Sequence, residues 1–302
     1  MKAWTRKLRF SAILSIFSVA ITLPGLTYGD CSGPGNNCVD GRLEIGYSNG
    51  DFIGLKDAYG EADLFVPLPF LDKCFSFIDA RGYRFNDNLS GASLGLGFRC
   101  CGLDIIDDSV WGANIFWDYR QGTLGEYFTR VGIGLEWLGN WDFRINGYIP
   151  TGTQIEHSRE RWVDSVSGFE VECDRYEYST SGGFDMEIGA PIGRVCNYWL
   201  YGATGPYFFT GAETTGYFGM QARLELHWKS FLSFQVRTSW DSKNQSQTQG
   251  TVFIILPFEL FANWCCLCTG NLGLNPYTKK VQRIGTIFMH RKGCNDNWYP
   301  IN

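Results

Sequence analysis

The fold is decided by residues 217–240, YFGMQARLELHWKSFLSFQVRTSW, in which apolar and polar side chains alternate through two adjacent segments. One side of the first segment holds Phe218, Met220, Ala222, Leu224, Leu226 and Trp228. One side of the second holds Leu232, Phe234, Val236, Thr238 and Trp240. Successive side chains of a β-strand point to opposite faces, so both segments are expected to be strands with one apolar wall. Lys229 and Ser230 leave room only for a tight turn, which predicts a hairpin.

The aromatic residues at the strand ends indicate where this apolar wall lies. A soluble sandwich also alternates, but its solvent face would seldom carry aromatics such as Trp228 and Trp240 at the strand ends. That placement is typical of the aromatic girdle of a membrane barrel, whose outside meets lipid and whose lumen is polar. The hairpin therefore favours a transmembrane β-barrel.

The composition agrees with many strands and turns. The chain has 302 residues, enough for one large barrel or two ordinary domains, with 37 glycines, 16 % aromatic and 19 % charged residues. Its net charge of −5 provides no concentrated basic surface, so nucleic-acid binding is not expected.

Residues 1–29 are predicted to be a signal peptide. Lys2, Arg6, Lys7 and Arg9 precede the largely apolar residues 10–26, and small residues mark a cleavage point before Asp30. The alternative is an uncleaved transmembrane anchor, but Pro24 and Gly25 near its end favour cleavage. The expected mature chain begins with a lead-in at 30–40 and functions outside the cytoplasm.

Eleven cysteines suit an oxidising compartment, and the odd number leaves at least one free or bonded to another molecule. Four of them lie in the tail at 261–302 and are the candidates for disulfides within or between chains: Cys265, Cys266, Cys268 and Cys294. No histidine lies at ligand spacing from this cluster, so zinc is less favoured than disulfides.

Alternation and turn residues predict an all-β, antiparallel, up-and-down transmembrane barrel of about twelve strands over residues 41–260, followed by a short tail. The predicted strands are 41–48, 61–69, 73–84, 90–101, 109–120, 126–138, 141–150, 182–191, 197–209, 216–228, 231–241 and 248–259. The longer links are 151–181 and 242–247. The first has its own alternating run at 169–178, which predicts an extra hairpin forming a surface loop or a lumen constriction.

The polar face of these strands is predicted to line the lumen. Its candidate residues are Arg99, Gly112, Asn114, Asp118, Arg130, Glu136, Arg144, Asn146, Glu187, Arg223, Glu225 and Arg237. Charges of both signs can pair across a narrow interior, and glycine leaves room for side chains from the opposite wall. We interpret this set as structural packing in preference to a selectivity filter.

The central segment is more specific than a general barrel. Residues 110–119 (VWGANIFWDY), 129–137 (TRVGIGLEW) and 146–150 (NGYIP) occur in that order. They resemble the β-domain of inverse autotransporters, the intimin and invasin family, and so do Gly95 to Arg99 upstream and residues 183–189 downstream. The resemblance runs from about residue 75 to about residue 258.

The resemblance implies a twelve-stranded outer-membrane barrel that the barrel-assembly machinery inserts and that helps to export a C-terminal passenger. Residues 281–288 resemble the segment that comes after the barrel in this family. The 302 residues contain neither immunoglobulin-like repeats nor a lectin-like tip, and no peptidoglycan-binding repeat precedes the barrel. The expected role is therefore a structural, surface-exposed envelope protein without its own passenger. The cysteines suggest disulfides to other Cys-rich envelope proteins, as in Chlamydia-like bacteria.

Two other functions remain open. A twelve-strand barrel could be a pore, open or plugged by the tail from residue 261 onward. An outer-membrane enzyme is less favoured, because His157, His227 and His290 lie in no recognisable nucleophile motif. No cofactor motif is present, so none is expected, and membrane lipid is the expected surrounding.

Overall fold

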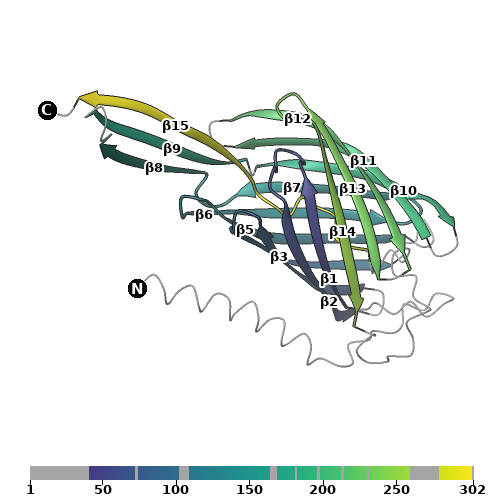
Figure 1. Cartoon of the computed structure of the whole chain (residues 1–302). Helices are drawn as coiled ribbons and strands as arrows, with labels where there is room; N and C mark the ends of the chain where they lie inside the picture. The colour runs from purple at the N-terminus through teal and green to yellow at the C-terminus, as the bar shows by residue number, and fades with distance from the viewer. Residues whose placement is uncertain are drawn as a thin grey trace.

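The computed structural model describes residues 41–71, 74–101, 109–163, 169–180, 182–195, 198–211, 214–229, 231–258 and 279–300. Twelve strands in these ranges form a closed antiparallel barrel (Figure 1). They are β1 (Arg42–Gly50), β2 (Tyr59–Leu71), β3 (Cys74–Phe85), β4 (Ser90–Cys101), β5 (Val110–Gln121), β6 (Tyr127–Leu138), β7 (Asp142–Pro150), β10 (Gly182–Val195), β11 (Tyr198–Gly211), β12 (Thr214–Trp228), β13 (Leu232–Asp241) and β14 (Gln245–Pro257). The predicted fold class and strand number are confirmed.

Two predicted strand boundaries are wrong by more than two residues. The strand predicted at 182–191 extends to Val195, past a register shift between Pro191 and Gly193 in its pairing with β11. The sequence predicts a link at 242–247, whereas β14 already begins at Gln245, which pairs with Asp241 of β13. The run Gln245-Ser246-Gln247 lacks apolar residues, so alternation provides no sign of a strand there. No helix in the described ranges is long and apolar enough to cross a membrane.

The barrel is closed by β1, which pairs with both β2 and β14. Arg42 lies opposite Pro257 at one end of this seam, and Gly50 lies opposite Gln249 at the other. We call the first the proximal end and the second the distal end. Up-and-down order places the link at 139–141 at the proximal end, and the end of β7 and the start of β10 at the distal end.

A second, three-stranded sheet extends from the distal end of the barrel (Figure 1). Its strands are β8 (Ile155–Val163), β9 (Phe169–Thr180) and β15 (Phe288–Pro300), with β9 in the middle. The β8–β9 hairpin confirms the predicted extra hairpin within 151–181. No strand is predicted at β15, because Gly293, Asn295 and Asn297 interrupt any apolar alternation. A segment from the tail therefore completes a sheet with a segment from the middle of the chain.

The outer wall of the barrel is apolar at mid-height and aromatic toward its ends. Leu96, Ile133 and Ile254 are 56 %, 51 % and 51 % exposed although they are large hydrophobic residues. Trp111, Trp137 and Phe143 stack in a row at the proximal end, and Tyr119 stacks on Tyr127 at the distal end. A continuous apolar band between two aromatic girdles is stable against lipid and unstable against water.

The inner wall is closely packed. Phe116 is 1 % exposed, and a Cβ added at Gly95 on the neighbouring strand would lie 2.2 Å from its ring. Glycine at position 95 therefore makes room for an interior phenylalanine. At the distal end the link between β1 and β2 folds inward, where the amide of fully buried Ile53 donates to Ser239 Oγ at 3.1 Å. Side chains and this link thus leave little empty space in the lumen.

Candidate functional site

Residues 279–287, which we call the strap, run through the lumen from the proximal to the distal end, and β15 continues from them (Figure 1). Lys279 Nζ lies 2.8 Å from both carboxylate oxygens of Asp142, the first residue of β7. At the other end, the carbonyl of Ile287 accepts a hydrogen bond from Arg120, near the end of β5. Val281 and Ile284 between them are 1 % and 5 % exposed. The strap is therefore part of the barrel's interior packing.

The proximal half of the strap is held by ion pairs to the wall. Lys280 Nζ lies 3.3 Å from Glu44, 2.9 Å from Glu61 and 2.9 Å from Asp63. Three carboxylates that would repel one another are thus gathered around one ammonium group. Removing that lysine would leave buried negative charge uncompensated.

Asp118 holds the middle of the strap to the wall. Both of its carboxylate oxygens accept hydrogen bonds from Arg283 of the strap, at 2.7 and 2.5 Å. One also accepts from Arg130 of β6 at 2.7 Å. All three side chains are almost completely buried, and the Arg283 guanidinium lies 4.2 Å above the Phe116 ring. Bidentate arginine–carboxylate pairs are directional, so this contact fixes the register of the strap.

Neutral side chains also hold the strap backbone. Ser93 Oγ donates to the carbonyl of Gly285 at 3.2 Å, and Asn146 Nδ2 donates to that of Gln282 at 3.2 Å. The amide of Ile284 donates to Tyr148 Oη at 2.9 Å. A buried extended segment needs such partners, because its amides and carbonyls have lost water.

The structure places the twelve candidate lumen residues on the inner wall, where they form several linked groups. Arg99 pairs with Glu136 at 2.7 Å, next to Gly112, where an added Cβ would lie 2.7 Å from the same carboxylate. Glu187 accepts from both Arg144 and Arg223. The remaining candidates are Asn114, Asp118, Arg130, Asn146, Glu225 and Arg237, which lie in the same interior. These groups are wall packing in which arginines pair with acids. Six of the twelve residues also touch the strap: Arg99, Asp118, Arg130, Asn146, Glu225 and Arg237.

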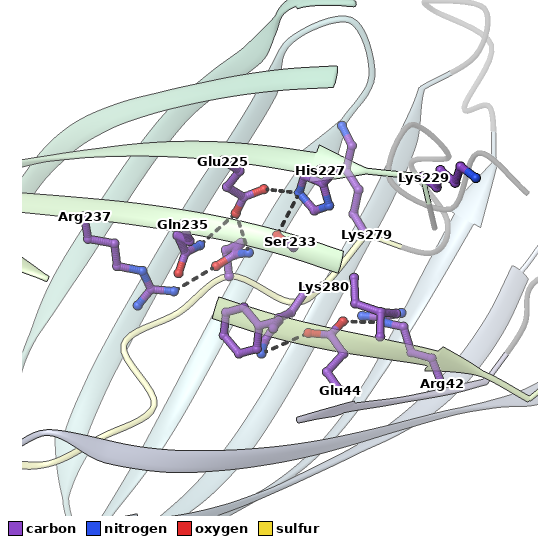
Figure 2. Close-up of a pocket in the computed structure, with 13 residues that line it drawn as sticks. Arg42, Glu44, Glu225, His227, Lys229, Ser233, Gln235, Arg237, Lys279 and Lys280 are labelled. Atoms are coloured by element: carbon purple, nitrogen blue, oxygen red, sulfur yellow. Dashed lines mark hydrogen bonds and ion pairs between the residues drawn. The ribbon is translucent and has the colours of Figure 1, made fainter. Parts of the chain in front are cut away.

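Beside the strap, a small cavity of about 70 Å³ remains at the proximal end (Figure 2). Glu225, Gln235 and Arg237 lie on one side of it, and Lys279 and Lys280 come from the strap on the other. It has room for several water molecules, since one needs only about 10–15 Å³ of such space.

Sequence reasoning missed several residues that complete the site. Arg81 and Arg120 of the wall and Lys279, Lys280 and Arg283 of the strap all make buried polar contacts. Asp79 and Arg81 do alternate with Ile78 and Ala80 in the sequence, which is a usable signal for the wall residues. The strap residues carry no comparable signal, because residues 279–287 show no strand pattern.

One disulfide is present in the described part of the chain, between Cys74 of β3 and Cys100 of β4. These residues lie directly opposite each other in the ladder. The disulfide candidates in the sequence are instead the tail cysteines Cys265, Cys266, Cys268 and Cys294. Cys265, Cys266 and Cys268 lie outside the described residues, and so does the side chain of Cys294, so their pairing stays a prediction.

Glu225, His227 and Ser233 on the inner wall do not have the geometry of a hydrolytic triad. His227 Nε2 lies 3.1 Å from Glu225 and 3.5 Å from Ser233 Oγ. A catalytic triad needs the acid and the nucleophile on different ring nitrogens, whereas here both contact the same one. Within the described ranges, no group of three His, Cys, Asp or Glu side chains could hold a metal ion.

At the distal end, the strap leaves the barrel beside His290 of β15. His290 Nε2 lies 3.2 Å from Lys243 Nζ in the link between β13 and β14. Burial, together with the nearby charges of Lys243 and Lys56, lowers the pKa of His290 from 6.5 to about 4. The contact between β15 and the barrel mouth therefore requires a neutral imidazole.

We expect acid to loosen this contact. Because the folded-state pKa of His290 is depressed, its contribution to stability is present above about pH 6.5 and is lost as the pH falls toward 4. Amide hydrogen exchange at the start of β15 should accelerate by about tenfold or more over that interval, after correction for intrinsic rates. His290→Gln should remove most of the acceleration. Equal acceleration in this variant would show that another group is responsible.

A closed antiparallel barrel with an apolar outer wall between aromatic girdles and a charged, filled interior is an outer-membrane β-barrel. The family model described as "Inverse autotransporter, beta-domain" matches residues 58–187, which confirms the family resemblance of the motifs. Residues 58–187 are thus similar to an inverse autotransporter β-domain, and the chain is an outer-membrane β-barrel.

Solved structures support the fold. The structure described as "Unveiling the Mechanism Behind the in-meso Crystallization of Membrane Proteins" is 15 % identical, with a TM-score of 0.59, and the match covers 84 % of this chain and all of that one. Outer membrane phospholipase A from Escherichia coli is 11 % identical over 77 % of this chain and 98 % of its own, with a TM-score of 0.41. No curated protein sequence matches the chain.

Proposed function

We propose that this protein is a plugged outer-membrane barrel that carries its own C-terminal segment through its lumen and displays it at the cell surface as part of the envelope. The observation that carries the proposal is the strap, which is held at both ends and in the middle and leads directly into β15. The family resemblance supports the same route, since inverse autotransporters export the segment C-terminal to the barrel.

The orientation is inferred from the links. Barrels of this kind place short turns in the periplasm and longer loops outside the cell. The longest link between neighbouring barrel strands, which contains the β8–β9 hairpin, is therefore assigned to the surface, and the three-residue link at 139–141 at the opposite end to the periplasm. On this assignment, β15 and its partners β9 and β8 form the exposed sheet.

Insertion and cross-linking complete the proposal. Residues 1–29 would direct export and be removed, leaving 30–40 as a lead-in to a barrel at 41–260. The barrel-assembly machinery would insert this barrel into lipid. The cysteines of the tail at 261–302 are available to pair with other Cys-rich envelope proteins. Such links would make the barrel a structural element of the envelope, with no catalytic role.

Surface exposure of the C-terminal end tests the proposal. An epitope joined after Asn302 should be reached by antibody and by added protease in intact cells. The matched control is the same epitope inserted between Gly139 and Asn140, in the link between β6 and β7, which should be reached only after the outer membrane is opened. If the epitope after Asn302 also needs opening, the proposed route is wrong.

A further inference from the structure

Four arginines of the wall each donate a hydrogen bond to a carbonyl of the strap backbone. Arg99 donates to Lys279 at 2.7 Å, Arg81 to Val281 at 2.8 Å and Arg120 to Ile287 at 2.6 Å. Arg130 donates to Ile284. The four arginines come from the adjacent strands β3 to β6, and their targets are two or three residues apart. In an extended chain that is a spacing of roughly 7–10 Å, so the contacts run along the whole length of the strap.

Each of these four arginines is also held in place by contacts to the barrel itself. Each pairs with an acid, at distances of 2.7 to 2.9 Å: Arg81 with Asp79, Arg99 with Glu136, Arg120 with Asp57 and Arg130 with Asp118. Each guanidinium also lies 4.1 to 5.4 Å from the centre of an aromatic ring, on Phe116, Phe77, Phe85 and Tyr148 respectively. Arg81 is 5 % exposed and the other three at most 1 %. Buried arginines restrained on two sides lose little conformational freedom when they bind a carbonyl.

A main-chain carbonyl is the same group at every residue. Contacts to it therefore hold an extended polypeptide irrespective of its side chains, as in strand addition to a sheet edge. The remaining strap contacts are of another kind, since Lys279, Lys280 and Arg283 pair through their own side chains. The wall therefore makes two kinds of contact with the strap. Its arginines bind the backbone carbonyls, and its acids bind the side chains of particular strap residues.

We propose that Arg81, Arg99, Arg120 and Arg130 form a track that binds any extended polypeptide segment of this chain as it passes through the lumen. The acids, above all Asp118, then fix the final register of the strap. The proposal rests on the proposed route through the barrel and adds its substrate class, an extended backbone with no sequence requirement.

Two substitutions in the wall test the track without leaving a buried carboxylate uncompensated. In Arg130→Met, Asp118 keeps Arg283, and in Arg120→Met, Asp57 reaches solvent because its side chain is 29 % exposed. The double variant should lower the surface-exposed fraction of an epitope after Asn302 by about tenfold. Arg237→Met is the matched control, because Arg237 donates only to the Gln282 side chain in the strap, and it should stay within about twofold of the wild type.

A strap variant supplies the converse test. Lys279→Met, Gln282→Ala and Arg283→Met together remove three polar strap side chains, while Asp142, Glu225 and Asp118 keep Arg144, Arg223 and Arg130. This chain should lose some display with these anchoring contacts, but should retain a several-fold larger surface-exposed fraction than the wall double variant, because the arginine contacts to the backbone remain. Heat-dependent gel mobility verifies in every case that the barrel has folded.

The outcomes separate the two proposals. If the wild-type epitope is not at the surface, the proposed route fails whatever the arginines do. If it is displayed, the track fails when the wall double variant equals Arg237→Met, or when the strap variant in a folded barrel is displayed no better than the wall double variant.

Discussion

Asp118→Asn releases the strap from the lumen. The substitution leaves Arg283 and Arg130 without their shared carboxylate, and removing one partner of a buried ion pair costs about 3–5 kcal/mol. Trypsin cleaves after Lys279, Lys280 and Arg283, but a protease cannot enter a filled barrel. Cleavage therefore reports the fraction of time that the strap spends outside. We expect the rate of cleavage in the strap to rise by about a hundredfold.

Glu187→Gln is the matched control. Glu187 also neutralises two arginines, Arg144 and Arg223, but neither belongs to the strap. This variant should lower the stability of the barrel and leave the protected strap sites within about threefold of the wild-type cleavage rate. Equal cleavage of the two variants would mean that general loosening of the barrel exposes the strap, and Asp118 would lose its assigned role.

Ile133→Arg should destabilise the barrel by about 2–4 kcal/mol when the protein is refolded into lipid vesicles. Ile133 is 51 % exposed and lies on β6 between the girdle residues Trp137 and Tyr127, close to mid-height of the apolar band. An arginine there faces hydrocarbon, where a charged group finds no solvation. Urea unfolding monitored by tryptophan fluorescence measures the change.

Trp141→Arg tests the dependence on depth. Trp141 is even more exposed, at 59 %, but lies in the proximal link between β6 and β7. Near the interface the same charge should cost only about 0–1 kcal/mol. Similar costs at both positions would contradict the assignment of the outer wall to lipid.

The barrel could be predicted from the sequence because its strands have lipid on one side and a polar interior on the other. That contrast produces a period of two, which is clear in residues 217–240. It gives a wrong strand boundary where Gln245 to Gln247 carry no apolar residue and where β10 continues past Pro191 to Val195. The disulfide between Cys74 and Cys100 could not be predicted, because eleven cysteines allow many pairings and strand register decides among them.

The residues that line the interior could be predicted from the sequence, but their partners in the strap could not. Arg130 and Asp118 are both expected in the lumen, yet their third partner, Arg283, is 165 residues from Asp118 in the chain. Residues 279–287 show no strand periodicity. The strap is stabilised by contacts with the surrounding wall and not by β-ladder pairing of its own. The pairing of β15 with β9 likewise depends on where the strap leaves the barrel.

The measurement that tests the central claim most directly is the conductance of the intact, refolded chain in a planar lipid bilayer. With residues 279–287 packed in the lumen, the wild-type protein should insert and remain closed, with at most brief openings. A stable open channel of uniform unit conductance would contradict the account and would favour a diffusion pore.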